Sequence, residues 1–140
     1  MGGYGAVSLL CRYPGTFSAS LSHAGALDPA FSIHYHQGSE PLSWMQDILG
    51  DYWENPGVYR EHNALHLLNR LKGRDDVFVA LEVGREDVLI DVNRDARDWL
   101  DKPGIPHIYA EYPGGHQWGP ERLLSLLPHL QYWRNTRLDR

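Results

Sequence analysis

The apolar positions along the chain alternate between an extended and a helical period. Within residues 75–84, positions 77–83 are almost continuously apolar, which is typical of a strand buried on both faces of a parallel sheet. Residues 105–112, which follow a Pro-Gly pair, are interpreted as a further strand, and residues 16–22 alternate apolar side chains with hydroxyls. The pattern therefore predicts three strands, at 16–22, 75–84 and 105–112.

Segments with helical spacing separate these strands. Apolar side chains recur three and four positions apart in residues 2–12, 58–73 and 88–102, and Gly or Pro follows each segment. A last helix is predicted around residues 123–133, with Pro128 bending it. Because strands alternate with helices, the sequence indicates an α/β fold with a parallel sheet.

Two features of this fold are unusual. Residues 30–57 are rich in Gly and Pro, with one helical candidate at Trp44–Leu49, and are predicted to form a variable, cap-like excursion. About three strands make a small sheet, and the first strand would present an open edge. We expect a partner chain to cover that edge, or the edge to serve as a surface for self-association.

Composition narrows the class of protein. A chain of 140 residues with 42% hydrophobic content is expected to fold as part of a single domain, residues 1–140. The net charge of −5 argues against a nucleic-acid partner. The sequence shows no membrane-spanning run or signal-peptide pattern, so we expect a cytoplasmic protein with no membrane partner. The single cysteine, Cys11, excludes an internal disulfide and fits a reducing compartment.

Chemically able side chains follow two of the predicted strands. Glu86 and Asp87 come just after the strand that ends at Val83, and His116 follows the strand that ends at Tyr112. Sites in open parallel sheets gather at the carboxyl ends of the strands, so the acid and the imidazole are expected to meet there. A carboxylate that orients a histidine makes up two thirds of a hydrolytic triad.

Simpler interpretations of the same residues remain open. Asp87 is well placed to cap a helix that begins at Val88, and this role can coexist with the first. His116 is also compatible with an ordinary loop histidine, and Gly114 and Gly115 with a tight turn.

Histidine pairs offer a rival chemistry. His34 and His36 are spaced to chelate from a strand, and His62 and His66 have the spacing of two ligands on one helical face. However, "HNALH" lacks the glutamate that follows the first histidine of zinc metalloproteases, and no third ligand is obvious. We therefore expect no metal and no organic cofactor.

No side chain is placed as a nucleophile beside His116. Ser8 and Cys11 lie within the first predicted helix, and Ser20 and Ser22 lie on a strand or at its end. Cys11 is expected to be a small buried side chain.

Four stretches, "MGGYGA", "YPGTFSASLSHAGALDP", "VGREDVLIDVNRDARDWL" and "GIPHIYAEYPGGHQWG", occur in order along the chain. Together they resemble the C-terminal half of the esterase family of α/β-hydrolases, which includes S-formylglutathione hydrolases, enterochelin esterases and feruloyl esterases. The resemblance implies a partial α/β-hydrolase fold that lacks the N-terminal strands and the nucleophile-elbow strand.

The resemblance also implies roles for individual residues. In this family the nucleophile elbow reads G-x-S-x-G-G, so Met1 matches the residue after the serine, and the opening glycines match the exit of the elbow. Asp87 matches the triad acid and His116 the general base. The backbone nitrogen of Met1 matches an oxyanion donor, and we expect Trp118 to lie in the substrate pocket.

The implied function is that of a serine carboxylic-ester or thioester hydrolase acting on a small molecule. This chain would be its C-terminal portion and inactive alone, because the serine would precede Met1. Two alternatives remain open: a non-catalytic binding or assembly protein, and one chain of a split esterase completed by another polypeptide.

Overall fold

Three parallel strands form one sheet in the computed structural model, which describes residues 1–138 without the side chains of residues 120–124 and 137–138. The sheet order is β1-β2-β3, with β1 at Ala19–His23, β2 at Phe78–Gly84 and β3 at His107–Tyr112. All seven residues of β2 are buried, as its continuous apolar run predicts for a central parallel strand. The predicted α/β class with three parallel strands and flanking helices is therefore confirmed.

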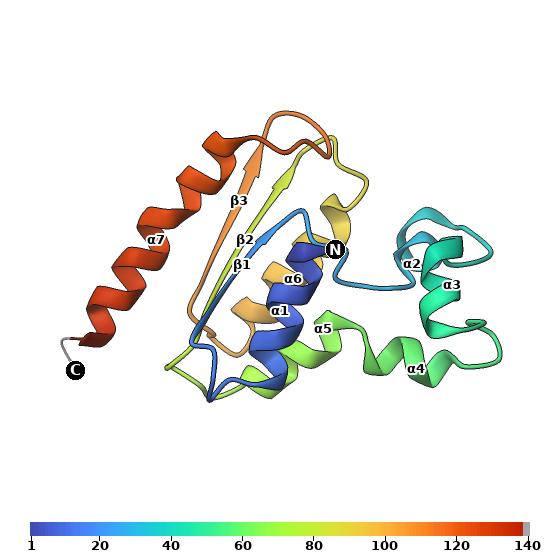
Figure 1. The fold of residues 1–140 in the computed structure, drawn as a ribbon, viewed down its shortest axis with the longest axis horizontal. Coiled ribbons are helices and arrows are strands. Elements are labelled where there is room, and N and C mark those ends of the chain that lie inside the picture. Colours follow the sequence, from blue (N-terminus) through green and yellow to red (C-terminus); the bar gives the residue numbers. More distant parts are fainter. Residues whose placement is uncertain (139–140) are drawn as a thin grey trace.

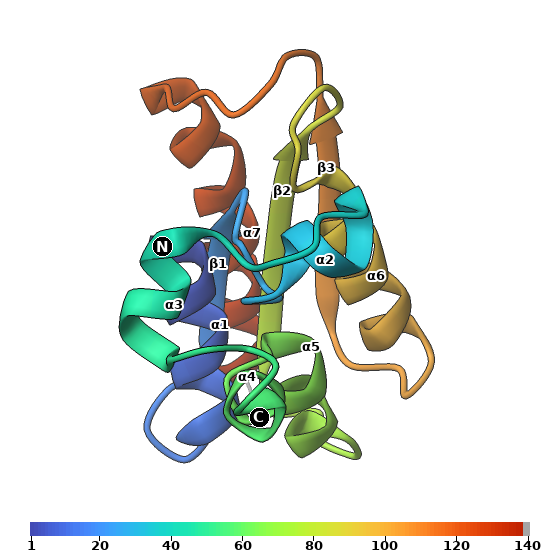
Figure 2. The ribbon, with the colours of Figure 1, turned by 90° about the vertical axis from the view of Figure 1, so that its right-hand side faces the viewer.

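Helices cover both faces of this sheet (Figure 1). One face packs against α1 (Gly2–Arg12), α5 (Ala64–Leu67), the 3-10 turn η1 (Leu68–Leu71) and α6 (Ile90–Asp101). The other face packs against α7 (Pro120–Leu138), which contains Pro128. The short helices α2 (Phe31–His36), α3 (Ser43–Leu49) and α4 (Pro56–Glu61) extend away from the sheet beyond α1 and α5 (Figures 1 and 2).

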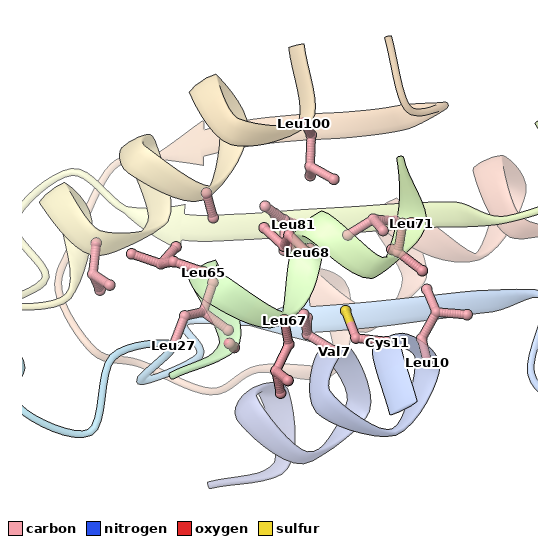
Figure 3. Packing of buried hydrophobic residues seen from close by; sticks show 14 of the residues in the cluster. Val7, Leu10, Cys11, Leu27, Leu65, Leu67, Leu68, Leu71, Leu81 and Leu100 are labelled. Atoms are coloured by element: carbon pink, nitrogen blue, oxygen red, sulfur yellow. The ribbon is translucent and has the colours of Figure 1, made fainter. Parts of the chain in front are cut away.

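The main core lies between the sheet and the face that carries α1 and α6. Leucines of α5 and η1 fill its centre, between α1 and β2 (Figure 3). Each fully buried leucine contributes about 1.5–3 kcal/mol through removal from water. Val79 and Leu81 of β2, the strand that precedes Asp87, also belong to this core.

The predicted helix at 58–73 is wrong as one continuous element. The chain forms α4, α5 and η1 instead, with a break at His62 and Asn63. Asn63 has extended backbone angles, and its side chain accepts a hydrogen bond from the Leu65 N–H. The Ala64 N–H donates to the Leu27 carbonyl at 2.8 Å. A tertiary hydrogen bond and an asparagine cap thus override the helical pattern.

The excursion at residues 30–57 is more helical than predicted. The expected helix at Trp44–Leu49 is present as α3, whereas α2 was not predicted. Asp28 Oδ1 accepts a hydrogen bond from the Ala30 N–H, which stabilises the turn that leads into α2. The strand predicted at 16–22 lies slightly later, at Ala19–His23, because the amides of Thr16 and Phe17 close a turn on the Tyr13 carbonyl.

Cys11 lies in the core, with 1% of its surface exposed, and burial raises the pKa of its thiol to about 12. At pH 8 only about 10⁻⁴ of the thiol is then ionised. We expect Ellman's reagent to leave the folded chain unlabelled over an hour and to label one thiol per chain in 6 M guanidinium chloride. Rapid labelling of the folded chain would contradict the burial of this side chain.

No helix within residues 1–138 is both long enough and apolar enough to cross a membrane.

Candidate active site

The structure brings Asp87 and His116 into contact at the carboxyl edge of the sheet. Asp87 follows β2 and His116 follows β3, and these neighbouring parallel strands end side by side (Figure 1). The Nδ1 atom of His116 lies 2.9 Å from Oδ2 of Asp87, although the two residues are 29 positions apart. With the proton on Nδ1, the imidazole donates to the carboxylate, and its Nε2 is left as a proton acceptor.

Asp87 uses both of its carboxylate oxygens. Oδ2 faces His116, whereas Oδ1 accepts a hydrogen bond of 2.9 Å from the Leu89 N–H, just before α6 begins at Ile90. The side chain of Asp87 is completely buried. The prediction that Asp87 caps a helix beginning at Val88 is wrong, because α6 begins at Ile90 and has Leu89 as its N-cap residue, without a side-chain cap. Asp87 instead stabilises the turn before α6 while it contacts His116.

Backbone contacts hold the two loops against each other. The Arg85 N–H donates to the Tyr112 carbonyl at 2.8 Å, and the Glu86 N–H donates to the Gly114 carbonyl at 3.1 Å. The Gly114 N–H donates in return to the Glu86 carboxylate. A Cβ atom on Gly84 would collide with the Gly114 carbonyl oxygen, so only glycine permits this approach.

The ring of His116 is open to solvent, with 64% of its side chain exposed. Two cavities, of about 300 and 200 Å³, flank it and share Met1, Ala24 and His116. The larger cavity is also lined by Gly2, Gly3, Leu21, His23, Gln117 and Trp118, and the smaller by Ala26, Phe31, Trp44, Val88 and Leu89.

Two tryptophans line these cavities from different parts of the chain. Trp118 lies two positions after His116, in the wall of the larger cavity, and is 70% exposed. Its contact with substrate stays a prediction. Trp44 belongs to α3 and lines the smaller cavity. The excursion at residues 30–57 therefore contributes a wall beside His116.

Met1 lies at the amino end of α1, where its carbonyl accepts a hydrogen bond from the Gly5 N–H. Because Met1 lines both cavities, the start of α1 faces the space in front of His116. The role of its backbone nitrogen as an oxyanion donor stays a prediction.

One glycine of the opening motif has a packing requirement. A Cβ atom on Gly3 would lie 2.5 Å from Ser22 Oγ and 2.8 Å from Gly25 Cα, whereas Gly2 and Gly5 have open space at that position. Gly3 is thus the point at which α1 approaches the chain leaving β1.

The histidine pairs considered as metal ligands do not converge. His34 Nδ1 lies 2.5 Å from Asp28 Oδ2, and His36 Nε2 lies 2.8 Å from the Val88 carbonyl oxygen. His62 and His66 do not share a helix, because the break at Asn63 separates α4 from α5. Among the described residues, no three His, Cys, Asp or Glu side chains gather in a metal-binding arrangement.

Sequence reasoning missed a second histidine–carboxylate pair near the site. His23 Nδ1 lies 2.6 Å from Glu82 Oε1, with side-chain exposures of 9% and 3%. A sequence signal was available, because Glu82 is the one charged residue in the apolar run of β2, and a buried carboxylate requires a partner.

Most of the chain is similar to known esterases. The family model described as "Putative esterase" matches residues 1–125. An acetyl esterase of Caldicellulosiruptor saccharolyticus is 30% identical over 128 residues, which cover 84% of this chain and 46% of that protein. The chain thus spans about half the length of this curated relative.

Solved structures share the fold at lower identity. A ferulic acid esterase superposes with a TM-score of 0.65 at 21% identity, covering 95% of this chain and 48% of that protein. The S-formylglutathione hydrolase of Staphylococcus aureus superposes with a TM-score of 0.62 at 19% identity, covering 84% of this chain and 45% of that protein. Dipeptidyl peptidase 4 of Porphyromonas gingivalis superposes with a TM-score of 0.71 at 20% identity, covering 95% of this chain and 18% of that protein.

Proposed function

Because this chain belongs to the Esterase family of the α/β-hydrolase superfamily, we propose that it supplies the acid and the base for hydrolysis of a carboxylic ester or thioester. The observation that carries this proposal is the 2.9 Å contact between His116 Nδ1 and Asp87 Oδ2 beside two cavities. The buried carboxylate orients an imidazole whose Nε2 is accessible.

In the proposed reaction His116 Nε2 takes the proton of a serine hydroxyl as the serine oxygen attacks the ester carbonyl carbon. The Nδ1–H bond to Asp87 stabilises the imidazolium that forms. His116 then gives the proton to the leaving alkoxide or thiolate, and an acyl-serine remains. Water, deprotonated by His116, attacks the acyl carbonyl and releases the acid and the serine.

We place the nucleophilic serine directly before Met1, as the family's elbow motif implies. Met1 and His116 share both cavities, so a residue bonded to Met1 would lie near the imidazole. Within the chain, Ser8, Ser20 and Ser22 are buried and line neither cavity. Under this proposal, residues 1–140 are inactive without the segment that carries the serine.

The outer edge of β1 is the proposed site of contact with that segment. Among the described residues β1 pairs only with β2, which leaves its other edge open. An apolar groove of about 230 Å³ runs along this edge, and Leu9 and Phe17 in it are each more than 40% exposed. If the enzyme is split, the same edge would bind the second polypeptide. If the protein assembles without catalysis, the edge would bind a copy of this chain.

Two samples test the proposal. The chain is expressed alone and together with the in-frame coding sequence upstream of Met1, and both are assayed on p-nitrophenyl acetate. We expect a G-x-S directly before Met1 and activity only in the longer protein. A stop codon at that place, with a native mass of 16.0 kDa, would contradict the single-chain esterase. Activity restored by a separate serine-bearing chain would establish the split enzyme instead.

A further inference from the structure

His23 lies beneath the loop that carries the base, at the end of β1, directly opposite Glu82 of β2 in the strand register. Its Nδ1 atom lies 2.6 Å from Glu82 Oε1, and the second oxygen of Glu82 accepts a hydrogen bond from Ser125 Oγ of α7. The carboxylate is thus partnered on both oxygens in a strand that is otherwise apolar. Such a pair is fixed in place, since moving either member leaves a buried charge without its partner.

The other nitrogen of His23 reaches the loop itself. Nε2 lies 2.8 Å from the carbonyl oxygen of Gln117, the residue after His116. A carbonyl oxygen only accepts hydrogen bonds, so this contact requires the proton to be on Nε2. Because Nδ1 contacts Glu82 of β2 and Nε2 contacts Gln117, the ring links the sheet to the loop.

Aromatic contacts enclose the same ring. Tyr112, the last residue of β3, stacks on His23 with 5.6 Å between ring centroids, and Trp118 packs against it edge-on at 4.9 Å. The hydroxyl of Tyr112 also lies 3.2 Å from His23 Nε2. His23 therefore contacts the loop at its start and at its end.

His116 depends on such anchoring because its own ring is mostly solvent-exposed. The contacts of Gly114 with Glu86 hold the loop before His116. After His116, the chain turns through a 2.8 Å hydrogen bond from the Gln117 N–H to the Gly115 carbonyl, and the Gln117 carbonyl is held by His23. The Gly114–Glu86 and Gln117–His23 contacts therefore hold the backbone on both sides of His116.

We infer that His23, held by Glu82, is a positioning residue for His116. This inference rests on the proposed function, because it assigns to His23 the task of keeping the base aligned toward the serine. If the imidazole shifts slightly from its place beside the serine hydroxyl, the rate of the chemical step falls, whereas the affinity for substrate does not change.

The test uses the double variant His23→Phe/Glu82→Leu, which removes the hydrogen bonds without leaving an unpaired buried carboxylate. His107→Phe is the matched control, since His107 is a partly buried histidine that bonds the Ile105 carbonyl at the opposite end of β3. Amide hydrogen exchange of residues 115–118 is measured in the full 140-residue chain. The serine-bearing form supplies kcat and KM.

We expect the double variant to speed exchange at residues 115–118 by about 10- to 100-fold, and the control to leave it unchanged. In the serine-bearing form kcat falls by about tenfold or more while KM stays constant. Unchanged exchange, or faster exchange with wild-type kcat, would overturn the positioning role alone. An inactive parent enzyme overturns the proposed function, and the positioning role with it, whatever the exchange result.

Discussion

Replacing His116 with alanine in the serine-bearing form is expected to lower kcat for ester hydrolysis by about 10⁶-fold, and Asp87→Asn by about 10⁴-fold. The larger loss reflects the removal of the group that takes the serine proton in the proposed reaction. The smaller loss arises because an amide at position 87 no longer selects the tautomer with Nδ1 protonated, in which Nε2 accepts a proton. Initial rates on p-nitrophenyl acetate measure both.

The double variant separates this mechanism from two independent roles. Because the acid and the base act as a unit, His116→Ala/Asp87→Asn is expected to be no slower than His116→Ala alone. His66→Ala is a suitable control, since His66 is an exposed histidine in α5, away from the two cavities. Losses that multiply in the double variant, or a wild-type rate in His116→Ala, would contradict the assignment.

Gly3→Ala is expected to destabilise the fold by about 2–3 kcal/mol, whereas Gly5→Ala is expected to stabilise it by up to about 1 kcal/mol. The two glycines lie in the same helix, but only Gly3 has no room for a methyl group, because Gly25 Cα would stand 2.8 Å from the new Cβ atom. Gly5 has open space there, so alanine only improves helix propensity.

Urea denaturation followed by far-ultraviolet circular dichroism measures both free energies of unfolding on the 140-residue chain. The pair controls for the general effect of replacing a helical glycine, since both changes add one methyl group to α1. Equal effects of the two substitutions would show that α1 and the chain after β1 do not meet at Gly3.

Local pattern was sufficient for much of the fold. The continuous apolar run of β2 and the Pro-Gly pair after α6 identify their elements, because burial on both faces and helix termination are properties of the segment itself. The break at Asn63 could not be predicted in this way, because the bond from the Ala64 N–H to the Leu27 carbonyl joins residues distant in sequence.

In the candidate site, too, some contacts could be predicted from the sequence and others could not. That Asp87 and His116 would meet could be predicted, since both follow neighbouring parallel strands and such strands end at one edge of the sheet. The link from His23 to the Gln117 carbonyl could not, because it depends on how the loop after β3 folds back over β1. The sequence did contain one indication of this link, because Glu82 is a charged residue within an apolar strand and requires a partner, which is His23.

The divided carboxylate of Asp87 has an evolutionary consequence. One oxygen holds the turn into α6 and the other holds His116, so selection for a folded protein and selection for its chemistry act on the same side chain. Asparagine at this position would present its carbonyl oxygen to one donor and its NH₂ group, which cannot accept, to the other. A relative without catalytic activity would still need this aspartate for the turn into α6, so under the proposed mechanism the presence of His116 is the more specific indicator of ester hydrolysis.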